Sequence, residues 1–553
     1  MNNLWTHPFL RNRYFIAIIG GLLWTGAFPR VDIAGLAWVA PGLILAAGLG
    51  KSPGEQFRLG YVAGLAHYLT MLYWLLLIPY RWHGIPLGPA AGWLSLSGVL
   101  ALFPALWSWL ASPAENQGEL AKGVLARNWF LRTAWAVSGA AMWVGWEMVL
   151  ARFLGGFPWA PLGASQYRMV PLIQLASITG VYGISFVVAW TSLALLSAGL
   201  LLIRRPTIRS VWLGEIFLPL ITVAIIFNVG LRHLNDNPPQ ARTVRLLLVQ
   251  PSIPQTVIWN PDTEVERFQE LLQQTEQALS NRVDIVVWPE SALPNMVRYN
   301  TNTMNAVAGL AKRHNVWIIL SSDDAERHPG AKPGTPPDFF NSSFLVTPEG
   351  ELRQRYIKRN LVIFGEYVPL AHWLPFLKMF TPIEGGFTPG THNVEFFLPE
   401  LDLHTSVLIC FEDTFPHLAR GNLSPQTDFL VNLTNDGWFG ESAEQWQHAL
   451  TAVFRAVENG VPLIRSCNNG LTSWIDSHGR IRQLLRDDRG TIYGKGVLLA
   501  EIPVGVPGSS HELTFYARHG DWFGWSCVAL LLVVLAWKVV ALKKPSLKPR
   551  IGA

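Results

Sequence analysis

Long apolar stretches dominate the first 230 residues, and shorter apolar runs separated by polar segments fill most of the rest. A helix that spans a membrane needs about 20 mostly apolar residues. This criterion predicts spans near 12–28, 33–49, 57–79, 88–111, 133–153, 172–202 and 211–230, and an eighth at 522–541. The first span begins with Arg11 and Arg13, as a signal peptide does, but no A-x-A cleavage pattern follows it. We therefore expect it to be a retained helix.

The segment between the seventh and eighth spans has a different pattern, in which short apolar runs alternate with amphipathic stretches. The runs predict strands at 244–250, 283–289, 316–322, 404–410, 428–434 and 461–467, and the stretches predict helices at 262–280, 302–314 and 441–459. Wholly apolar strands alternating with helices are typical of an α/β layer fold with sheets buried on both faces.

The distribution of charge supports a division into a membrane part and a water-soluble part. The first 230 residues hold 14 Lys or Arg and 6 Asp or Glu, far fewer than the roughly 25% charged residues of a soluble protein. We predict a transmembrane helical domain of about seven spans at 1–232, a catalytic-type α/β domain at 233–520, and a last helix with a basic tail at 521–553.

Loop charges predict the orientation of the spans. The loops on one side of the predicted membrane carry 14 Lys or Arg, and those on the other side carry 4. Cytoplasmic loops are enriched in Lys and Arg. Both termini are therefore expected in the cytoplasm, and 233–520 is expected on the opposite, periplasmic side of an inner membrane.

Charge and cysteine content also exclude some classes of function. Residues 231–521 hold 24 Lys or Arg against 32 Asp or Glu, so no basic surface for nucleic acid is expected. The three cysteines, Cys410, Cys467 and Cys527, form no CxxC and no Cys/His ligand spacing. A disulfide framework or a zinc site finds no support in this pattern.

Three polar residues stand at or just after predicted strands, where α/β folds usually place their sites. Glu290 follows VDIVVWP, Lys358 lies in ELRQRYIKRN, and Cys410 ends HTSVLIC. Each has an ordinary interpretation by itself: a loop carboxylate, a surface lysine and a packed thiol. Their contexts are more specific: VWPESALP, YIKRNLVIFGEYVP and LICFEDTFP resemble, in the same order, three signature segments of the carbon–nitrogen hydrolase (nitrilase) superfamily.

Further segments resemble one membrane branch of that superfamily, the apolipoprotein N-acyltransferases. They are GGFPWAPLGASQ (155–166) and PLIQLASITGVYGISF (171–186) in the membrane half, and WQHALTAVFRAVENGVPLIRSCNNG (446–470) in the soluble half. The resemblance covers nearly the whole chain. It implies a multi-pass helical membrane bundle joined to a nitrilase-like αββα sandwich.

The resemblance also implies a reaction that suits these residue types. Cys410 would be the nucleophile that forms a thioester, Glu290 the general base, and Lys358 the charge that lowers the thiol pKa and binds the oxyanion. The acyl donor would be a membrane phospholipid, typically phosphatidylethanolamine. The acceptor would be the α-amino group of the N-terminal S-diacylglyceryl cysteine of an apolipoprotein, the last step of lipoprotein maturation. No cofactor and no metal is expected.

Five more residues match supporting or substrate-binding positions of the family: Glu366, Glu412, Trp259, Phe411 and Trp438. Phe411 stands where a tyrosine often follows the nucleophile. Asn360 and Ile363 also depart from the family pattern, which often has His and Pro there. These departures bear on local geometry and substrate preference rather than on the triad.

Two other functions fit parts of the sequence. A membrane-anchored amidase would use the same triad, but one anchoring span would suffice for it. A transporter or channel with a sensing domain is a different class, and such proteins usually carry several ionisable residues inside the membrane. Glu147 is the one clear intramembrane acidic residue, because Glu215 lies only four residues from the start of its predicted span, and this favours the acyltransferase.

Overall fold

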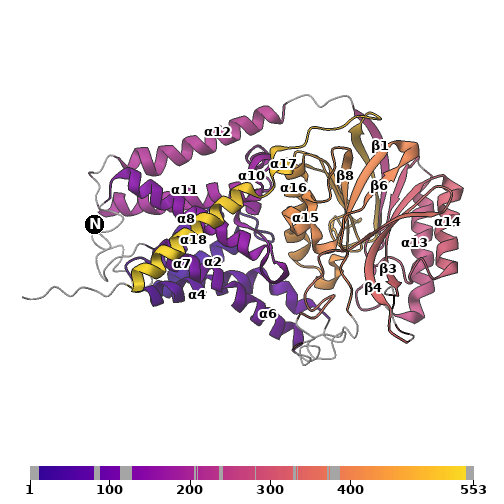
Figure 1. The fold of residues 1–553 in the computed structure, drawn as a ribbon, viewed down its shortest axis with the longest axis horizontal. Helices are drawn as coiled ribbons and strands as arrows, with labels where there is room; N and C mark the ends of the chain where they lie inside the picture. The colour runs from indigo at the N-terminus through magenta and orange to yellow at the C-terminus, as the bar shows by residue number, and fades with distance from the viewer. Residues whose placement is uncertain are drawn as a thin grey trace, which may run out of the picture.

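The computed structural model describes residues 12–79, 87–112, 127–204, 207, 210–235, 241–258, 260–280, 282–327, 330, 332, 334–369, 373 and 386–543. A bundle of helices forms one half of the molecule, and two sheets with their covering helices form the other (Figure 1). The last helix, α18 (Trp522–Lys543), returns from the sheets to the bundle and packs against α8 (Trp129–Leu150).

Each of the eight predicted spans coincides with helical structure. The N-terminal helices are α2 (Arg13–Gly26), η2 (Ala34–Trp38), α3 (Ala40–Gly48), α4 (Pro53–Met71), η3 (Tyr73–Leu77), α6 (Gly88–Leu100), α7 (Leu102–Ala111), α8, η5 (Phe153–Gly155), η6 (Leu162–Gln166), α9 (Val170–Ile173), α10 (Ala176–Thr179), α11 (Val181–Arg204), η7 (Trp212–Phe217) and α12 (Leu218–His233). The span predicted at 172–202 is broken, because Gly180 adopts a left-handed φ of +67° between α10 and α11.

Four helical segments among the described residues are long and apolar enough to cross a membrane: Gly88–Ala111, Val181–Ile203, Trp212–His233 and Trp522–Val540. Shorter apolar helical segments are Arg13–Gly26, Ala34–Gly48 and Val170–Thr179.

Close packing inside the bundle depends on glycine. Gly60 and Gly64 lie four residues apart on α4, and a Cβ at either would lie 2.6 Å from Pro104 of α7. Small residues at this spacing let helix backbones approach closely.

The second half contains two six-stranded sheets. One has the order β12-β1-β2-β3-β4-β5 and the other β11-β10-β9-β8-β7-β6. The strands are β1 (Ala241–Gln250), β2 (Ile285–Val287), β3 (Trp317–Glu326), β4 (Asp338–Val346), β5 (Leu352–Ile357), β6 (Glu395–Leu398), β7 (Leu403–Ile409), β8 (Thr427–Thr434), β9 (Leu463–Cys467), β10 (Ser473–Ile475), β11 (Ile481–Leu484) and β12 (Gly496–Gly505). The three central strands of each sheet, β1 to β3 and β7 to β9, are parallel.

Helices cover the outer face of each sheet. The inner faces pack on one another through an apolar core that includes Leu246, Ile285, Val407 and Val431. The helices α13 (Glu264–Ala278) and α14 (Thr301–His314) cover the β1–β5 sheet, and α15 (Pro416–Arg420) and α16 (Glu444–Asn459) cover the other (Figure 1). The predicted combination of a helical membrane bundle and an αββα sandwich is thus confirmed.

The helix α16 lies between its sheet and the membrane half. Its Gln447 accepts hydrogen bonds from the indole N–H groups of Trp74 and Trp159, at 3.0 and 3.1 Å, and donates one to the Pro29 carbonyl at 2.9 Å. The carboxylate of Glu458 accepts a hydrogen bond from the backbone N–H of Val181 at 2.8 Å. One apolar core is therefore continuous from the bundle to the outer face of the sheet.

Candidate active site

Cys410 lies at the carboxyl end of β7, as the first residue of the turn η11 (Cys410–Thr414). Its φ is +53°, a left-handed conformation that is uncommon for a residue with a side chain and often marks a functional site. Asn432, on the neighbouring parallel strand β8, donates a hydrogen bond to the Cys410 carbonyl at 2.9 Å. This contact fixes the turn, and Cys410 as a whole residue is half-buried.

Glu290 and Lys358 lie together beside Cys410. Glu290 follows β2, and its carboxylate lies close enough to Cys410 for its charge to act on the thiol. Lys358 follows β5, and its Nζ lies 3.7 Å from Glu290 Oε1. Both side chains are almost fully buried. The structure therefore brings the three predicted triad residues, which come from three separate strand ends, into one cluster.

Glu366 completes a network around Lys358. Its Oε1 lies 2.8 Å from Lys358 Nζ, and its Oε2 accepts the backbone N–H of Val362 at 2.8 Å. The amide of Asn341, on β4, donates to Glu290 at 2.8 Å and to Glu366 at 3.0 Å. Sequence reasoning missed Asn341, because it gave no strand there and a lone Asn in NSS carries no distinctive pattern.

Several opposing effects act on the pKa of the Cys410 thiol. Burial and the negative charge of Glu290 raise this pKa well above its usual value, although Lys358 acts to lower it. Lys358 thus acts in the expected direction, but its charge does not outweigh burial in the unliganded site, because desolvation of a thiolate costs more than one nearby cation returns. Burial also raises the pKa of Glu290, which Lys358 opposes. The resting nucleophile carries its proton.

The ammonium of Lys358 is a stable positive charge. Burial acts to lower its pKa, but the negative groups of Glu366, Cys410 and Glu290 together outweigh burial, and the pKa is raised. A permanently charged donor at this position suits the stabilisation of a developing oxyanion.

Glu412, two residues after the nucleophile, is wholly buried. Its carboxylate accepts hydrogen bonds from the backbone N–H groups of Ile409 (2.8 Å), Arg359 (2.7 Å) and Asn360 (3.1 Å), and from the hydroxyl of Tyr356. It thereby ties the segment that carries Lys358 to the turn that carries Cys410. This is a positioning role.

The predicted aromatic residues take different places. Phe411 points away from the triad and packs against Phe157 and Trp159 of the membrane half, with ring centroids 6.0 and 6.3 Å apart. Trp438 is half-buried in η12 (Asp436–Phe439), directly after β8. Trp259 lies outside the described residues, as does most of the segment 367–390, for which the sequence predicts a lid over the site.

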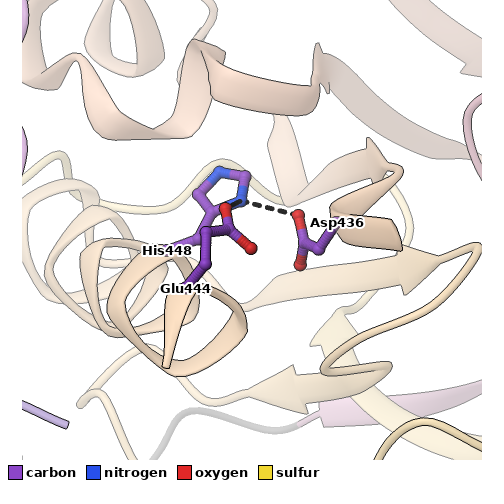
Figure 2. A group of neighbouring side chains, drawn as sticks. All are labelled: Asp436, Glu444 and His448. Carbon is purple, nitrogen blue, oxygen red and sulfur yellow. Dashed lines mark hydrogen bonds and ion pairs between the residues drawn. The ribbon is translucent and has the colours of Figure 1, made fainter. Parts of the chain in front are cut away.

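A second polar cluster lies on the other side of the β6–β11 sheet, and its ligand atoms come within 4.8 Å of one another (Figure 2). The ring of His448 binds Asp436 through Nδ1 and Asp413 through Nε2, each at 2.8 Å, while Glu444 lies one helical turn before it. Burial acts to lower the pKa of His448, but the two aspartates raise it to about 10. Both ring nitrogens of His448 are thus engaged by carboxylates, and the cluster forms a buried network of ion pairs.

Known proteins resemble the chain over most of its length. The family model "Carbon-nitrogen hydrolase" matches residues 245–505, and "Apolipoprotein N-acyltransferase N-terminal domain" matches residues 20–194. A protein from Geobacter metallireducens described as apolipoprotein N-acyltransferase is 36% identical, with 95% of each chain covered. One of the same description from Vibrio vulnificus is 31% identical, over 95% of this chain and 97% of that one.

Solved structures are also similar. An amidase of the nitrilase superfamily from Nesterenkonia is 15% identical, covers 51% of this chain and 95% of that chain, and has a TM-score of 0.34. A nitrilase-superfamily protein from Saccharomyces cerevisiae is 19% identical, covers 47% of this chain and 90% of that chain, and also has a TM-score of 0.34.

The fold, the two family models and the full-length relatives agree. The apolar helices and the bacterial relatives identify a bacterial membrane protein. The chain belongs to the apolipoprotein N-acyltransferase family and is an N-acyltransferase.

Proposed function

We propose that the protein N-acylates lipoproteins by transferring a fatty acyl chain from a membrane phospholipid, through a thioester on Cys410, to the α-amino group of an N-terminal S-diacylglyceryl cysteine. The observation that carries this proposal is the clustering of Cys410 with Glu290 and with the Lys358 ammonium, whose Nζ lies 3.7 Å from Glu290 Oε1. The turn that holds Cys410 packs through Phe411 against the membrane half, which favours a lipid donor over a small soluble amide.

In the first half-reaction the Cys410 sulfur attacks the ester carbonyl carbon of the donor. Glu290 takes the thiol proton as the C–S bond forms, and Lys358 stabilises the oxyanion. The intermediate collapses to the thioester, and Glu290 returns the proton to the departing lysophospholipid oxygen. Because the thiol pKa is raised, the sulfur becomes a thiolate only as this proton moves.

In the second half-reaction the neutral amine of the acceptor attacks the thioester carbon. Glu290 takes a proton from the attacking nitrogen and passes it to the Cys410 sulfur when the C–S bond breaks. The products are an amide and the free thiol, so the cycle is ping-pong and needs no external oxidant or reductant.

The nucleophile assignment predicts the behaviour of two variants. Purified protein incubated with phospholipid labelled in its acyl chain should form a hydroxylamine-sensitive adduct. Cys410→Ala should abolish this adduct, because the charges of Glu290 and Lys358 act on the Cys410 thiol. Cys467→Ala should retain it, since Cys467 is buried beside Asp436 instead. An adduct that survives Cys410→Ala and disappears with Cys467→Ala would reverse the assignment.

A further inference from the structure

Two consecutive aspartates on β3 point to opposite faces of their sheet, as neighbours on a strand do. Asp324 is fully buried and forms ion pairs with Arg298 and Arg355. Asp323 faces the other way and is accessible to solvent. The carboxylate of Asp323 has no hydrogen-bond or ion-pair partner within the described part of the chain, which sets it apart from its neighbour.

The register of the sheet places Asp323 beside the triad. Asp323 pairs across the antiparallel ladder with Asn341, the residue that donates to both Glu290 and Glu366. Residues directly opposite one another in such a ladder have Cβ atoms about 5 Å apart and point to the same face. The charged groups that act on Asp323 are Glu290, Glu366 and Lys358.

These groups give the site an excess of negative charge. Three carboxylates surround one ammonium, and Lys358 is already paired with Glu366 and Glu290. The protein atoms packed around Asp323 reduce its hydration although part of the residue stays accessible. This reduced hydration, followed by the charges of Glu290 and Glu366, raises the pKa of Asp323 to about 7. An unpaired carboxylate in this setting attracts a small cation from the substrate.

We propose that Asp323 binds a primary ammonium group of the substrate beside Glu290 and accepts its proton. This rests on the proposed function, which supplies two such groups: the α-ammonium of the acceptor and the ethanolamine headgroup of a donor lipid. The position favours the acceptor, because its nitrogen must reach the thioester carbon next to Glu290.

The step balances without a further reactant. The ammonium passes one proton to the Asp323 carboxylate and becomes a neutral amine, whose lone pair attacks the thioester carbon. Glu290 takes the second proton and returns it to the Cys410 sulfur as the C–S bond breaks. Asp323 then releases its proton to water. An α-amino group with a pKa near ~8 is matched to a carboxyl group that titrates near 7.

The test separates the two half-reactions of the full-length protein in lipid nanodiscs. Thioester formation is measured in single turnovers with phosphatidylethanolamine and with phosphatidylglycerol, and transfer is measured by mixing preformed thioester with a diacylglyceryl-modified peptide. For Asp323→Asn we expect transfer at low acceptor concentration to fall about 10- to 100-fold, from loss of one charge-assisted contact, with thioester formation from both lipids unchanged. Asp323→Glu should restore part of the transfer rate, and Asp488→Asn, on an exposed turn, should leave both steps unchanged.

The pH profile supplies an independent measurement. In the wild type, transfer should fall as the pH drops below about 7, where Asp323 becomes protonated, and this decline should be weaker in Asp323→Asn. The proposal is overturned if Asp323→Asn transfers the acyl chain at the wild-type rate. It is also overturned if this variant loses thioester formation equally with both lipids. A loss confined to phosphatidylethanolamine assigns the ammonium site to the donor and overturns its assignment to the acceptor. If the wild-type protein forms no thioester from either lipid, the proposed function itself is wrong. This outcome is measured on the wild type alone, so it is distinguished from a failure of the Asp323 proposal.

Discussion

At the scale of single residues, the carboxylate of Glu412 holds the Lys358 segment and the Cys410 turn in register. Replacing it with glutamine keeps the shape but turns an N–H₂ group toward backbone donors. We expect Glu412→Gln to slow thioester formation about 100-fold, because a misplacement of about 1 Å near the reacting atoms can cost that much. Single-turnover acylation with labelled phospholipid measures this rate.

The matched control for Glu412 is Glu501→Gln, on the exposed part of β12, which should acylate at the wild-type rate. The Glu412 variant should also show a lower maximal rate with little change in half-saturating lipid concentration, since Glu412 reaches no substrate. A normal maximal rate in folded Glu412→Gln protein would contradict the positioning role.

His448 predicts how stability depends on pH. Its folded pKa, about 10, exceeds the unfolded value near ~6.5, so its contribution is fully present below the unfolded value and is lost as pH rises through 10. Thermal unfolding in detergent should show a midpoint that falls between about pH 7 and 10. His448→Gln should lower the midpoint at pH 6.5 by about 5 °C or more, because it removes the imidazolium that both buried aspartates share. A variant with the wild-type pH slope would refute this account.

The residues of the triad could be predicted because each lies in a distinctive local motif. The residues that act through other residues are harder to predict. Glu412 is expected as a supporting residue only from the family resemblance, because its contacts are with backbone groups 53 and 52 positions away. Asp323 is not predicted, because it gains its place from a strand pairing with Asn341. The direction of the Phe411 side chain depends on Phe157 and Trp159 in the other half of the molecule. A local sequence pattern does not reveal such long-range contacts.

At the scale of elements, α16 connects the two halves through Gln447. We expect Gln447→Leu to lower the thermal unfolding midpoint by about 5 °C, because the buried indoles of Trp74 and Trp159 lose their acceptor. Unfolding can be followed by tryptophan fluorescence in detergent. Gln277→Leu, on the exposed face of α13, is the control and should change the midpoint little. An equal effect of both substitutions would exclude a specific contact.

Whether the sequence predicts an element depends largely on how apolar that element is. All six predicted strands and three predicted helices are present, with ends shifted by a few residues at most. Sequence patterns missed six strands. Three of them, β6, β10 and β11, are short, β4 and β5 contain polar residues, and the apolar run of β12 is interrupted by Glu501 and Pro503. β5 reads LRQRYI and β4 contains NSS at its centre, next to the site. Antiparallel outer strands need fewer apolar residues than buried parallel ones, so apolarity alone does not reveal them.

At the scale of the whole molecule, the remaining prediction concerns topology, which rests on the charges of the loops. A reporter fused at residue 330 should be active only outside the cytoplasm, and one fused after Ala553 should be active only inside it, because the basic loops favour the cytoplasmic side. Paired enzymatic reporters of opposite compartment preference measure both positions. Cytoplasmic activity at both would refute the arrangement of seven spans followed by one.

Fifteen of the sixteen residues of α16 are buried, although the helix contains Glu444, His448, Arg455 and Glu458. One face covers the β6–β11 sheet and the other lines the membrane bundle, so a single helix serves as outer layer for one half and inner wall for the other. The two halves therefore share one helix, and neither half is an exchangeable module. A catalytic half cut from the bundle would present this helix and its charged pairs to water on one side. Substitutions that reshape either half must be accommodated by the other, so the pair is bound to evolve as one unit.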